Sequence, residues 1–317
     1  MLKADNIVSV RQYYLAVFLT ISLLSILIVR FFQLQILDYD QYSKKANTNR
    51  IRKVTTSAPR GLILDRNGQI LVDNLPTYIL NAVPGELTNK GQTFDLISKL
   101  VNYDSIALSK NYRRYYRGRF IPTRIAKDLT FDQISRLEEN RLNLEGVYYQ
   151  IFPERYFPSV VNASHILGYV REVDKGIRQS LDNPTQYELG DIIGWSGLEK
   201  RYENYLKGRH GIQFYQVDAY GREAGYVSDF PPRDPEPGRN IITTIDLDIQ
   251  YSLENIMEGK KGVIIVGSPE TGEILGAVSK PDFSPDLFTG RILESDWNDL
   301  LLNPDKPLVN RFNQGLY

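Results

Sequence analysis

The sequence predicts an α+β protein, in which one apolar helix precedes a β-rich region that carries a mostly helical insertion. Three observations support this class. An uncharged apolar run lies near the N-terminus, short apolar segments alternate with Asn-Gly and Pro-Gly turn signals, and one interval of helical spacing interrupts them. The 317 residues include 21 Tyr, 16 Pro and 23 Gly, a composition that favours β-rich, turn-rich structure.

The N-terminal apolar run is long enough to cross a membrane. Residues 12–29 contain no charge, and Arg11 and Arg30 bracket them. A spanning helix needs about 17–25 apolar residues, and Arg30 can extend its charge to the interface. A cleaved signal peptide is disfavoured, because Arg30-Phe31-Phe32-Gln33 is a poor cleavage site. A buried helix of a soluble domain is the other alternative to a single uncleaved anchor.

We expect an anchor at 13–37 that follows a cytoplasmic tail at 1–12. The positive-inside count does not decide the orientation, because basic residues lie on both sides of the run. Long domains translocate largely regardless of charge, so we expect the bulk of the chain outside the cytoplasm. The absence of cysteine is compatible with that location.

Turn signals divide the next part of the chain into short strands. The clearest signal is Asp65-Arg66-Asn67-Gly68 between Gly61–Asp65 and Gln69–Val72, because Asn-Gly supplies the positive φ values of a tight hairpin. Further strands are expected at Thr77–Val83, Val147–Phe152 and His165–Val170, with Pro153 ending the second, and a hairpin at Gly211–Ala219 and Gly221–Val227. A polar loop or short helix is expected at 174–186, and a helix at Ser196–Leu206 with Ser196 and Glu199 as a capping box.

Residues 87–145 change character and predict an inserted, mostly helical subdomain. Phe94, Ile97, Leu100 and Val101 recur at helical spacing, and Ile134, Leu137 and Leu142 do so after Thr130. We call this segment the head.

The Pro-rich segment Phe230–Gly238 is the best candidate for a linker. Beyond it we expect a strand at Asn240–Ile245, a helix capped by Asp246 and running to about Glu258, and two strands at Gly262–Gly267 and Glu273–Ser279. Asp246 and Asp248 are interpreted as helix-terminal residues and not as a catalytic pair. Four successive apolar residues, Val263 to Val266, predict a strand that is buried on both faces.

Several kinds of chemistry are excluded by composition. The chain has no cysteine and two histidines, which excludes a disulfide scaffold, a Cys-ligated metal and a cysteine nucleophile. We find no Gly-rich phosphate loop and no metal motif, and we expect no cofactor and no metal. Ser196, His165 and His210 are interpreted as structural residues. The 38 basic and 38 acidic residues give a net charge of zero, which argues against a general nucleic-acid binder.

One local segment, Asn111–Phe120, is both basic and aromatic. It contains Arg113, Arg114, Arg117 and Arg119, and Lys110, Arg124 and Lys127 extend it. We consider two main interpretations, a solvated face of the head and a surface that binds an anionic partner, with nucleic acid a remote third.

Five motifs in one order resemble class B penicillin-binding proteins. They are Ala58–Gly68; Arg155-Tyr156-Phe157-Pro158 with His165–Val170; Gly197–Glu203 with Leu206-Lys207-Gly208; Thr243–Asp246 with Gln250; and Gly262–Val266 with Thr271–Leu275. The inserted head fits the elongation-type penicillin-binding protein 2 better than the division type, which stays open as an alternative.

The resemblance implies an anchored pedestal at 38–238, with the head at 87–145, and the start of a penicillin-binding transpeptidase domain at 239–317. The family cross-links the stem peptides of peptidoglycan by serine acyl transfer and is acylated by β-lactams. Asn310-Arg311 and Gln314–Tyr317 resemble the family's approach to its active site, and the nucleophile would lie four positions past Tyr317. The sequence contains no Ser-x-x-Lys and no Lys-Thr-Gly, so we name no catalytic residue.

We therefore expect these 317 residues to be the incomplete N-terminal part of a longer transpeptidase, inactive by themselves. A membrane-anchored scaffold without catalysis and a catalytically dead relative are the alternatives. The resemblance implies an inner-membrane, single-pass protein with its bulk in the periplasm. It also implies a SEDS-type glycosyltransferase and other cell-elongation proteins as partners, with peptidoglycan strands as substrate of the parent protein.

Overall fold

The computed structural model describes residues 10–39, 51–158, 161–217, 223–226, 231–289, 292 and 294–315. The chain divides into two compact units, one of residues 1–52 with 215–226 and one of residues 53–214 with 227–317. We describe each unit by itself. The α+β class with one N-terminal apolar helix is confirmed.

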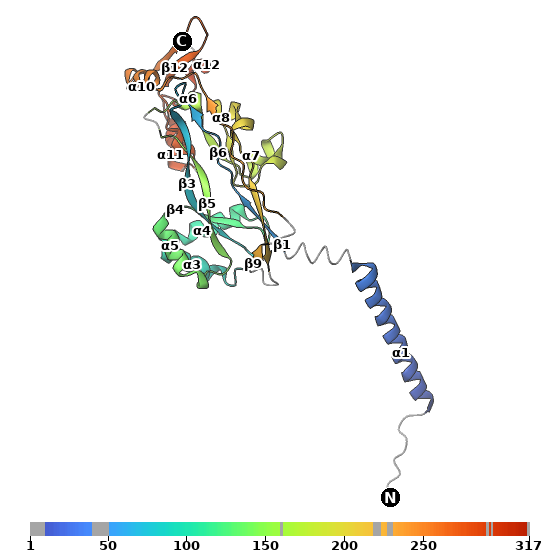
Figure 1. Ribbon diagram of the computed structural model, residues 1–317. Coiled ribbons are helices and arrows are strands. Elements are labelled where there is room, and N and C mark those ends of the chain that lie inside the picture. The colour runs from blue at the N-terminus through green and yellow to red at the C-terminus, as the bar shows by residue number, and fades with distance from the viewer. Residues whose placement is uncertain are drawn as a thin grey trace. The chain divides into compact units, whose positions relative to one another are not determined.

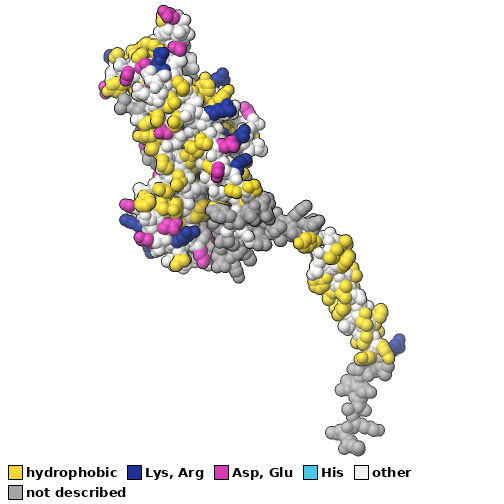
Figure 2. Space-filling model, viewed as in Figure 1, with side chains coloured by type: hydrophobic (Ala, Val, Ile, Leu, Met, Phe, Trp, Pro, Cys, Tyr) yellow, Lys and Arg dark blue, Asp and Glu magenta, His cyan; other side chains and the backbone are white. Residues whose placement is uncertain are grey.

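The first unit contains the apolar helix α1 (Val10–Phe32), which continues into a π-helical turn at Gln33–Leu37. Residues 11–37 are long and apolar enough to cross a membrane by length and composition. Figure 2 shows hydrophobic side chains along this helix. The unit also holds the paired ends of β8 (Gly211–Val217) and β9 (Glu223–Tyr226), where Tyr215 lies opposite Tyr226 in an antiparallel ladder. The expected hairpin is confirmed within the described residues.

Two long antiparallel strands form the centre of the second unit. β3 (Ile70–Ala82) pairs with β5 (Val147–Tyr156) over ten residues, from Asp73 opposite Tyr156 to Ala82 opposite Val147. Figure 1 shows them side by side between the helices of the head at one end and α10 (Leu247–Ile256), β12 (Ile274–Lys280) and α12 (Arg311–Gln314) at the other. Further strands in this unit are β1 (Ile51–Thr56, from Lys53 on), β2 (Ile63–Leu64), β4 (Thr123–Leu129) and β10 (Ile241–Ile242), and the main sheet runs β10-β2-β3-β4.

The expected interruptions of these strands are wrong. β3 runs without a break through Pro76, and β5 continues past Pro153 to Tyr156. The two prolines lie directly opposite each other in the ladder. Because neither residue has an N–H group to donate, both fit at one rung without leaving a donor unpaired.

The hairpin between β2 and β3 is confirmed. The buried carboxylate of Asp65 accepts hydrogen bonds from the backbone N–H groups of Asn67 and Gln69, both at 2.7 Å. Gly68 completes the turn with φ of 84°, a conformation that glycine adopts at low cost.

The head contains three helices packed on the sheet: α3 (Lys90–Val101), α4 (Ser105–Tyr115) and α5 (Phe131–Glu139). Two of them were expected, whereas α4 and the strand β4 were missed. A capping box begins α5, where the Thr130 side chain accepts from the backbone N–H of Gln133 and the Gln133 side chain accepts from the backbone N–H of Thr130. The core combines residues of all these elements: Leu80, Ala82, Phe94, Ile97, Val101, Leu108, Ile125, Ala126, Leu129, Ile134, Leu137 and Leu144. Leu142 does not continue α5, because it lies in a 3₁₀ turn (η2, Arg141–Asn143) and is 94% exposed.

Short elements follow β5. They are α6 (Ser164–Leu167), β6 (Val170–Glu172), α7 (Lys175–Ser180), η3 (Pro184–Gln186), β7 (Ile192–Gly194), α8 (Gly197–Arg201) and α9 (Glu203–Leu206). The expected strand at His165–Val170 is wrong, because its first residues form α6. Left-handed φ values at Ala163 (39°) and Gly168 (77°) bracket that helical turn and separate it from β6.

The C-terminal part contains α10 (Leu247–Ile256), the hairpin β11 (Gly262–Gly267) and β12 (Ile274–Lys280), η4 (Pro285–Phe288), α11 (Glu294–Leu302) and α12 (Arg311–Gln314). Asp246 caps α10 as predicted, accepting from the N–H groups of Asp248 and Ile249. Leu253 of α10 and Met257, which directly follows the helix, pack on Val278. β11 is not buried on both faces in this structure, since Ile265 is 53% exposed.

The Pro-rich segment is not a free linker over its described residues. Arg233 pairs with Ile212, and Glu236 pairs with Arg209, in isolated antiparallel bridges. β10 then pairs in parallel with β2, Ile241 opposite Ile63. Local composition predicted a linker, but the backbone groups of Arg233 and Glu236 have long-range hydrogen-bond partners.

Candidate functional site: a buried arginine–glutamate cluster

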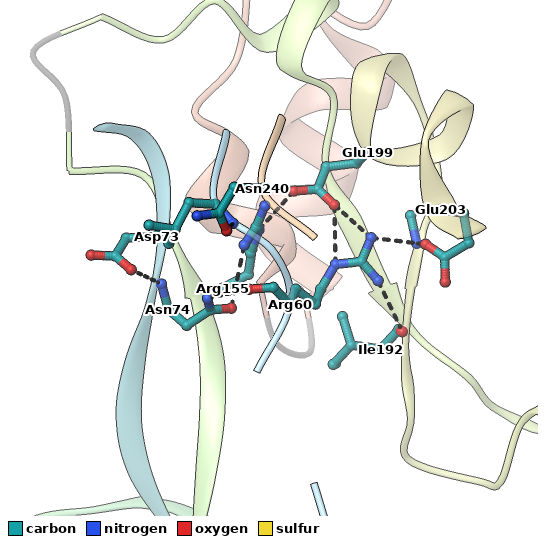
Figure 3. Close-up of polar contacts among 10 residues, drawn as sticks. Arg60, Asp73, Asn74, Arg155, Ile192, Glu199, Glu203 and Asn240 are labelled. Carbon is teal, nitrogen blue, oxygen red and sulfur yellow. Dashed lines mark hydrogen bonds and ion pairs between the residues drawn. The ribbon is translucent and has the colours of Figure 1, made fainter. Parts of the chain in front are cut away.

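Four charged side chains meet in the second unit: Arg60, Arg155, Glu199 and Glu203. We call them the arginine–glutamate cluster (Figure 3). Arg60 precedes β2, Arg155 lies near the end of β5, and the two glutamates lie on α8 and α9. The arginines and Glu199 are at most 7% exposed.

Glu199 is the centre of the cluster. Its Oε2 accepts from Nη2 of Arg60 at 2.7 Å and from Nε of the same residue at 3.1 Å, while its Oε1 accepts from Nε of Arg155 at 2.6 Å. Figure 3 shows the two guanidinium groups converging on this carboxylate. Both oxygens of the carboxylate therefore accept from charged donors, which form the strongest class of protein hydrogen bond.

Glu203 extends the cluster toward the neighbouring loop. Its Oε2 accepts from Arg60 at 2.8 Å and from the backbone N–H of Gly194 at 2.8 Å, and its Oε1 accepts from the Tyr187 hydroxyl at 2.9 Å. Burial raises the pKa of Tyr187, and the Glu203 carboxylate raises it further.

Two positive and two negative groups balance the charge of the cluster. Burial by itself lowers the pKa of Arg60, but the charges of Glu199 and Glu203 raise it above its ordinary value. Burial lowers the pKa of Arg155, and the Arg60 charge adds to that effect against the attraction of Glu199. Both guanidinium groups stay protonated, since an arginine pKa lies far above neutral pH. The cluster therefore depends on both glutamate side chains being in place.

Asn74 connects the cluster to the long sheet. Its side-chain amide donates to the carbonyl of Arg60 at 2.7 Å, and its oxygen accepts from Nη1 of Arg155 at 3.3 Å. One residue of β3 thus fixes the backbone of the segment before β2 and the side chain of β5.

Glycines permit the close approach of these segments. A Cβ on Gly61 would lie 1.9 Å from the carbonyl oxygen of Arg239, and a Cβ on Gly168 would lie 1.9 Å from that of Ser196. Neither position can hold a side chain without displacing backbone. Both glycines belong to the motifs that carry the family resemblance.

A second junction joins β2 and the loop before α6 to the C-terminal part. The backbone N–H of Arg66 donates to the carbonyl of Ile245 at 2.9 Å. The Glu254 carboxylate of α10 accepts from the backbone N–H groups of Asn162 and Ala163, at 2.9 and 2.8 Å. Gln250, fully buried, exchanges two hydrogen bonds with the backbone of Ala277 in β12. Residues before 170 are thereby fixed to residues after 240.

The expected capping box at Ser196 is wrong. Ser196 precedes α8, but its side chain makes no cap hydrogen bond, and Glu199 is used by the two arginines. His165 lies against the ring of Phe283, with the ring centroids 5.4 Å apart. His210 accepts from the backbone N–H of Ala58 at 3.1 Å and lies 3.4 Å from Asp191, so it joins segments that are distant in sequence.

Several members of the basic and aromatic segment face other parts of the protein. Arg124 pairs with Glu172 at 2.7 Å, and its guanidinium lies 4.4 Å from the centroid of the Tyr115 ring. Arg114 lies 3.9 Å from Asp174, and Arg117 pairs with Glu188. Lys127 pairs with Glu154. The segment is therefore a solvated face only in part. Arg113 and Arg119 are exposed, whereas the paired residues attach the head to β5, β6 and the segment 174–188.

The arrangement provides rigidity and no reaction centre. The central carboxylate is fully buried, so it is closed to a substrate. Among the described residues, no group of three His, Asp or Glu side chains could hold a metal ion. Sequence inspection included Arg60, Arg155 and Glu199 within motifs but did not bring them together, since no local signal pairs residues separated by 139 positions.

Comparison with known proteins agrees with this structure. Residues 55–243 match the penicillin-binding protein dimerisation domain, and they include all four members of the cluster. This match covers more than half of the chain, so the chain belongs to that family of penicillin-binding proteins.

The relatives of the chain indicate a more specific class of penicillin-binding protein. The chain is 32% identical over 320 residues to the peptidoglycan D,D-transpeptidase MrdA of Escherichia coli (strain K12), an alignment that covers 99% of this chain and 50% of MrdA. It is 30% identical to MrdA of Haemophilus influenzae, covering 99% of this chain and 48% of that protein. Penicillin-binding protein 2 of Helicobacter pylori, in its complex with MreC, superposes with a TM-score of 0.69 at 26% identity, over 84% of this chain and 49% of that one. The predicted likeness to penicillin-binding protein 2 is confirmed, and the chain spans about half the length of these relatives.

Proposed function

We propose that these residues form the N-terminal, non-catalytic part of an elongation-type peptidoglycan D,D-transpeptidase. The observation that carries the proposal is the 32% identity to MrdA along 99% of the chain. The buried cluster supports it, because it joins three of the segments on which the family resemblance rests. The relatives named MrdA favour the elongation type over the division type.

In this proposal the pedestal carries the catalytic domain at a fixed position. We assign a cytoplasmic tail to 1–12, the membrane anchor to 13–37, the pedestal to 38–238 and the start of the transpeptidase domain to 239–317. The hydrogen bonds between Arg66 and Ile245, and from Asn162 and Ala163 to Glu254, support a rigid connection between the last two. The serine that attacks the stem peptide, and that β-lactams acylate, is supplied by a Ser-x-x-Lys motif that these residues lack.

We further propose an inner-membrane location with the bulk of the chain in the periplasm. The apolar helix at 11–37 supports the membrane location. MreC is the proposed partner, since the H. pylori relative is seen in complex with MreC. A SEDS-type glycosyltransferase is a second proposed partner, implied by the family resemblance.

Labelling of native membranes with fluorescent penicillin tests the function, when this N-terminus is detected by an antibody in the same gel. A labelled band well above 36.4 kDa that carries this N-terminus is the expected result. An unlabelled band at 36.4 kDa would favour the non-catalytic scaffold instead. A labelled band at 36.4 kDa would show a nucleophile within these residues and overturn the proposal.

A further inference from the structure

A groove on the head is not used by any contact described above. It lies between α3 and α4 and has a volume of about 540 Å³. Its lining includes Lys90, Phe94, Asp95, Ile106, Lys110 and Arg113. Phe94 is 2% exposed, whereas Ile106 is 74% exposed. The groove therefore combines an apolar side chain open to solvent with charged residues around it.

The charges of the groove are unbalanced. Three cationic side chains line it, against the single carboxylate of Asp95. In the described part of the chain, Lys90, Lys110 and Arg113 have no acidic partner within ion-pair distance, although the ammonium of Lys90 lies 4.8 Å from the centroid of the Tyr112 ring. Lys90 is also the first residue of α3, where the helix dipole adds positive potential.

The arginines next to the groove differ from the basic residues that line it. Arg114 and Arg117 follow Arg113 in the sequence, and both lie near carboxylates of the segment 172–188. The basic segment is thus divided into residues that hold the head in place and residues that line the groove without compensation. An anionic occupant would supply the missing carboxylates.

We propose that this groove binds an acidic amphipathic segment of a partner protein. Its carboxylates pair with Lys90, Lys110 and Arg113, and an apolar side chain of the segment lies against Ile106. Charge complementarity sets the orientation, and burial of Ile106 adds affinity that a simple polyanion lacks. The inference goes beyond the proposed transpeptidase function and needs no catalytic activity for its test.

The test uses the full chain in nanodiscs of uncharged lipid and a synthetic amphipathic peptide with glutamates flanking a row of leucines. Comparison probes are the same peptide with glutamine for glutamate, polyglutamate of equal charge, and a peptidoglycan stem peptide. The variant Lys90→Glu/Lys110→Glu/Arg113→Glu removes the charges of the groove. The matched control Lys99→Glu/Arg119→Glu/Arg141→Glu reverses three basic residues of the head outside it.

We expect the amphipathic peptide to bind more tightly than all three comparison probes. Reversal in the groove should weaken binding by at least about tenfold, and the control should weaken it by less than about threefold. Equal losses in the two variants would reduce the effect to general electrostatics and overturn the proposal. Absence of binding, or preferential binding of polyglutamate or of the stem peptide, would also overturn it.

A photocrosslinking residue at position 106 tests the same site without changing its charges. Crosslinks to the amphipathic peptide are expected from position 106 and not from position 142, which is equally apolar and 94% exposed in the same head. Crosslinks from position 142 alone would place the peptide elsewhere and contradict the proposal.

Discussion

Nε of Arg155 lies 2.6 Å from Oε1 of Glu199, and both side chains are completely buried. The two residues are 44 positions apart and belong to different elements, β5 and α8. Arg60 approaches the other oxygen of the same carboxylate, from a position 139 residues earlier. A single carboxylate thus holds three distant segments of the chain together, and its loss should affect the whole second unit.

Replacing Glu199 by glutamine should strongly destabilise the second unit. The two guanidinium groups would stay charged and buried beside a neutral amide, which costs about 3–5 kcal/mol when one partner of a buried pair is lost. Urea unfolding, followed by the fluorescence of Trp195 and Trp297, measures the change. Glu138→Gln is the control, because Glu138 lies 3.8 Å from Arg141 on the surface and should change stability by less than about 0.5 kcal/mol. Equal effects of the two substitutions would contradict a central role for Glu199.

The head should loosen when Arg124 and Glu172 no longer pair. Their side chains are 9% and 8% exposed, so solvent screens the pair poorly. We expect a coupling energy of at least about 1 kcal/mol in a double-mutant cycle of Arg124→Met and Glu172→Gln. The exposed pair Arg141 and Glu138 should give a value near zero by the same method. Hydrogen exchange of α4 should accelerate in Glu172→Gln, and unchanged exchange there would refute the attachment.

Gly168 and Gly272 offer a matched pair of alanine substitutions. Their φ values are 77° and 73°, so both residues have the positive φ that favours glycine. A Cβ on Gly272 has no neighbour within 4 Å, and Gly272→Ala should cost about 1 kcal/mol. A Cβ on Gly168 would lie 1.9 Å from the carbonyl oxygen of Ser196, so Gly168→Ala should cost at least about 3 kcal/mol. Similar urea midpoints for the two variants would show that this contact relaxes freely.

Stability should fall as the pH drops below 6.5 because of His165. Burial lowers the pKa of His165 from its ordinary 6.5, the Arg311 charge lowers it further, and Asp282 opposes both. Between that lowered value and 6.5 the unfolded chain binds a proton that the folded chain does not, so the contribution is complete above pH 6.5 and is lost as the pH falls through the folded pKa. Urea midpoints of wild type and His165→Gln, measured from about pH 7.5 to 4.5, give the difference curve. If the urea midpoint of His165→Gln falls with pH as steeply as that of the wild type, another group causes the effect.

The local signals of the chain predicted many of its elements correctly. Periodic apolar residues predicted α3 and α5, and Asn67-Gly68 predicted the turn between β2 and β3. Asp246 was correctly expected to cap α10. Each of these features depends on residues within a few positions of one another, so the local sequence is sufficient to predict it.

The errors share a physical cause. Pro153 suggested the end of a strand, but it lies opposite Pro76 in the ladder between β3 and β5, and β5 continues past it. Ser196 and Glu199 have the spacing of a capping box, but the Glu199 carboxylate accepts from two buried guanidinium groups instead. The basic segment suggested one solvated face, but carboxylates from 172–188 neutralise part of it. In all three cases a distant partner overrides the local preference.

By itself, the sequence determined the α+β class, the apolar N-terminal helix and, through its motifs, the resemblance to penicillin-binding proteins, since these depend on composition, spacing and local order. Only the tertiary structure decided that Arg60, Arg155 and Glu199 form one buried cluster. It alone also showed that Lys90, Lys110 and Arg113 have no acidic partner among the residues that the structure describes. The reason is that charged side chains pair according to their distance in space. Burial strengthens these ion pairs, because it removes the water that would otherwise screen the charges.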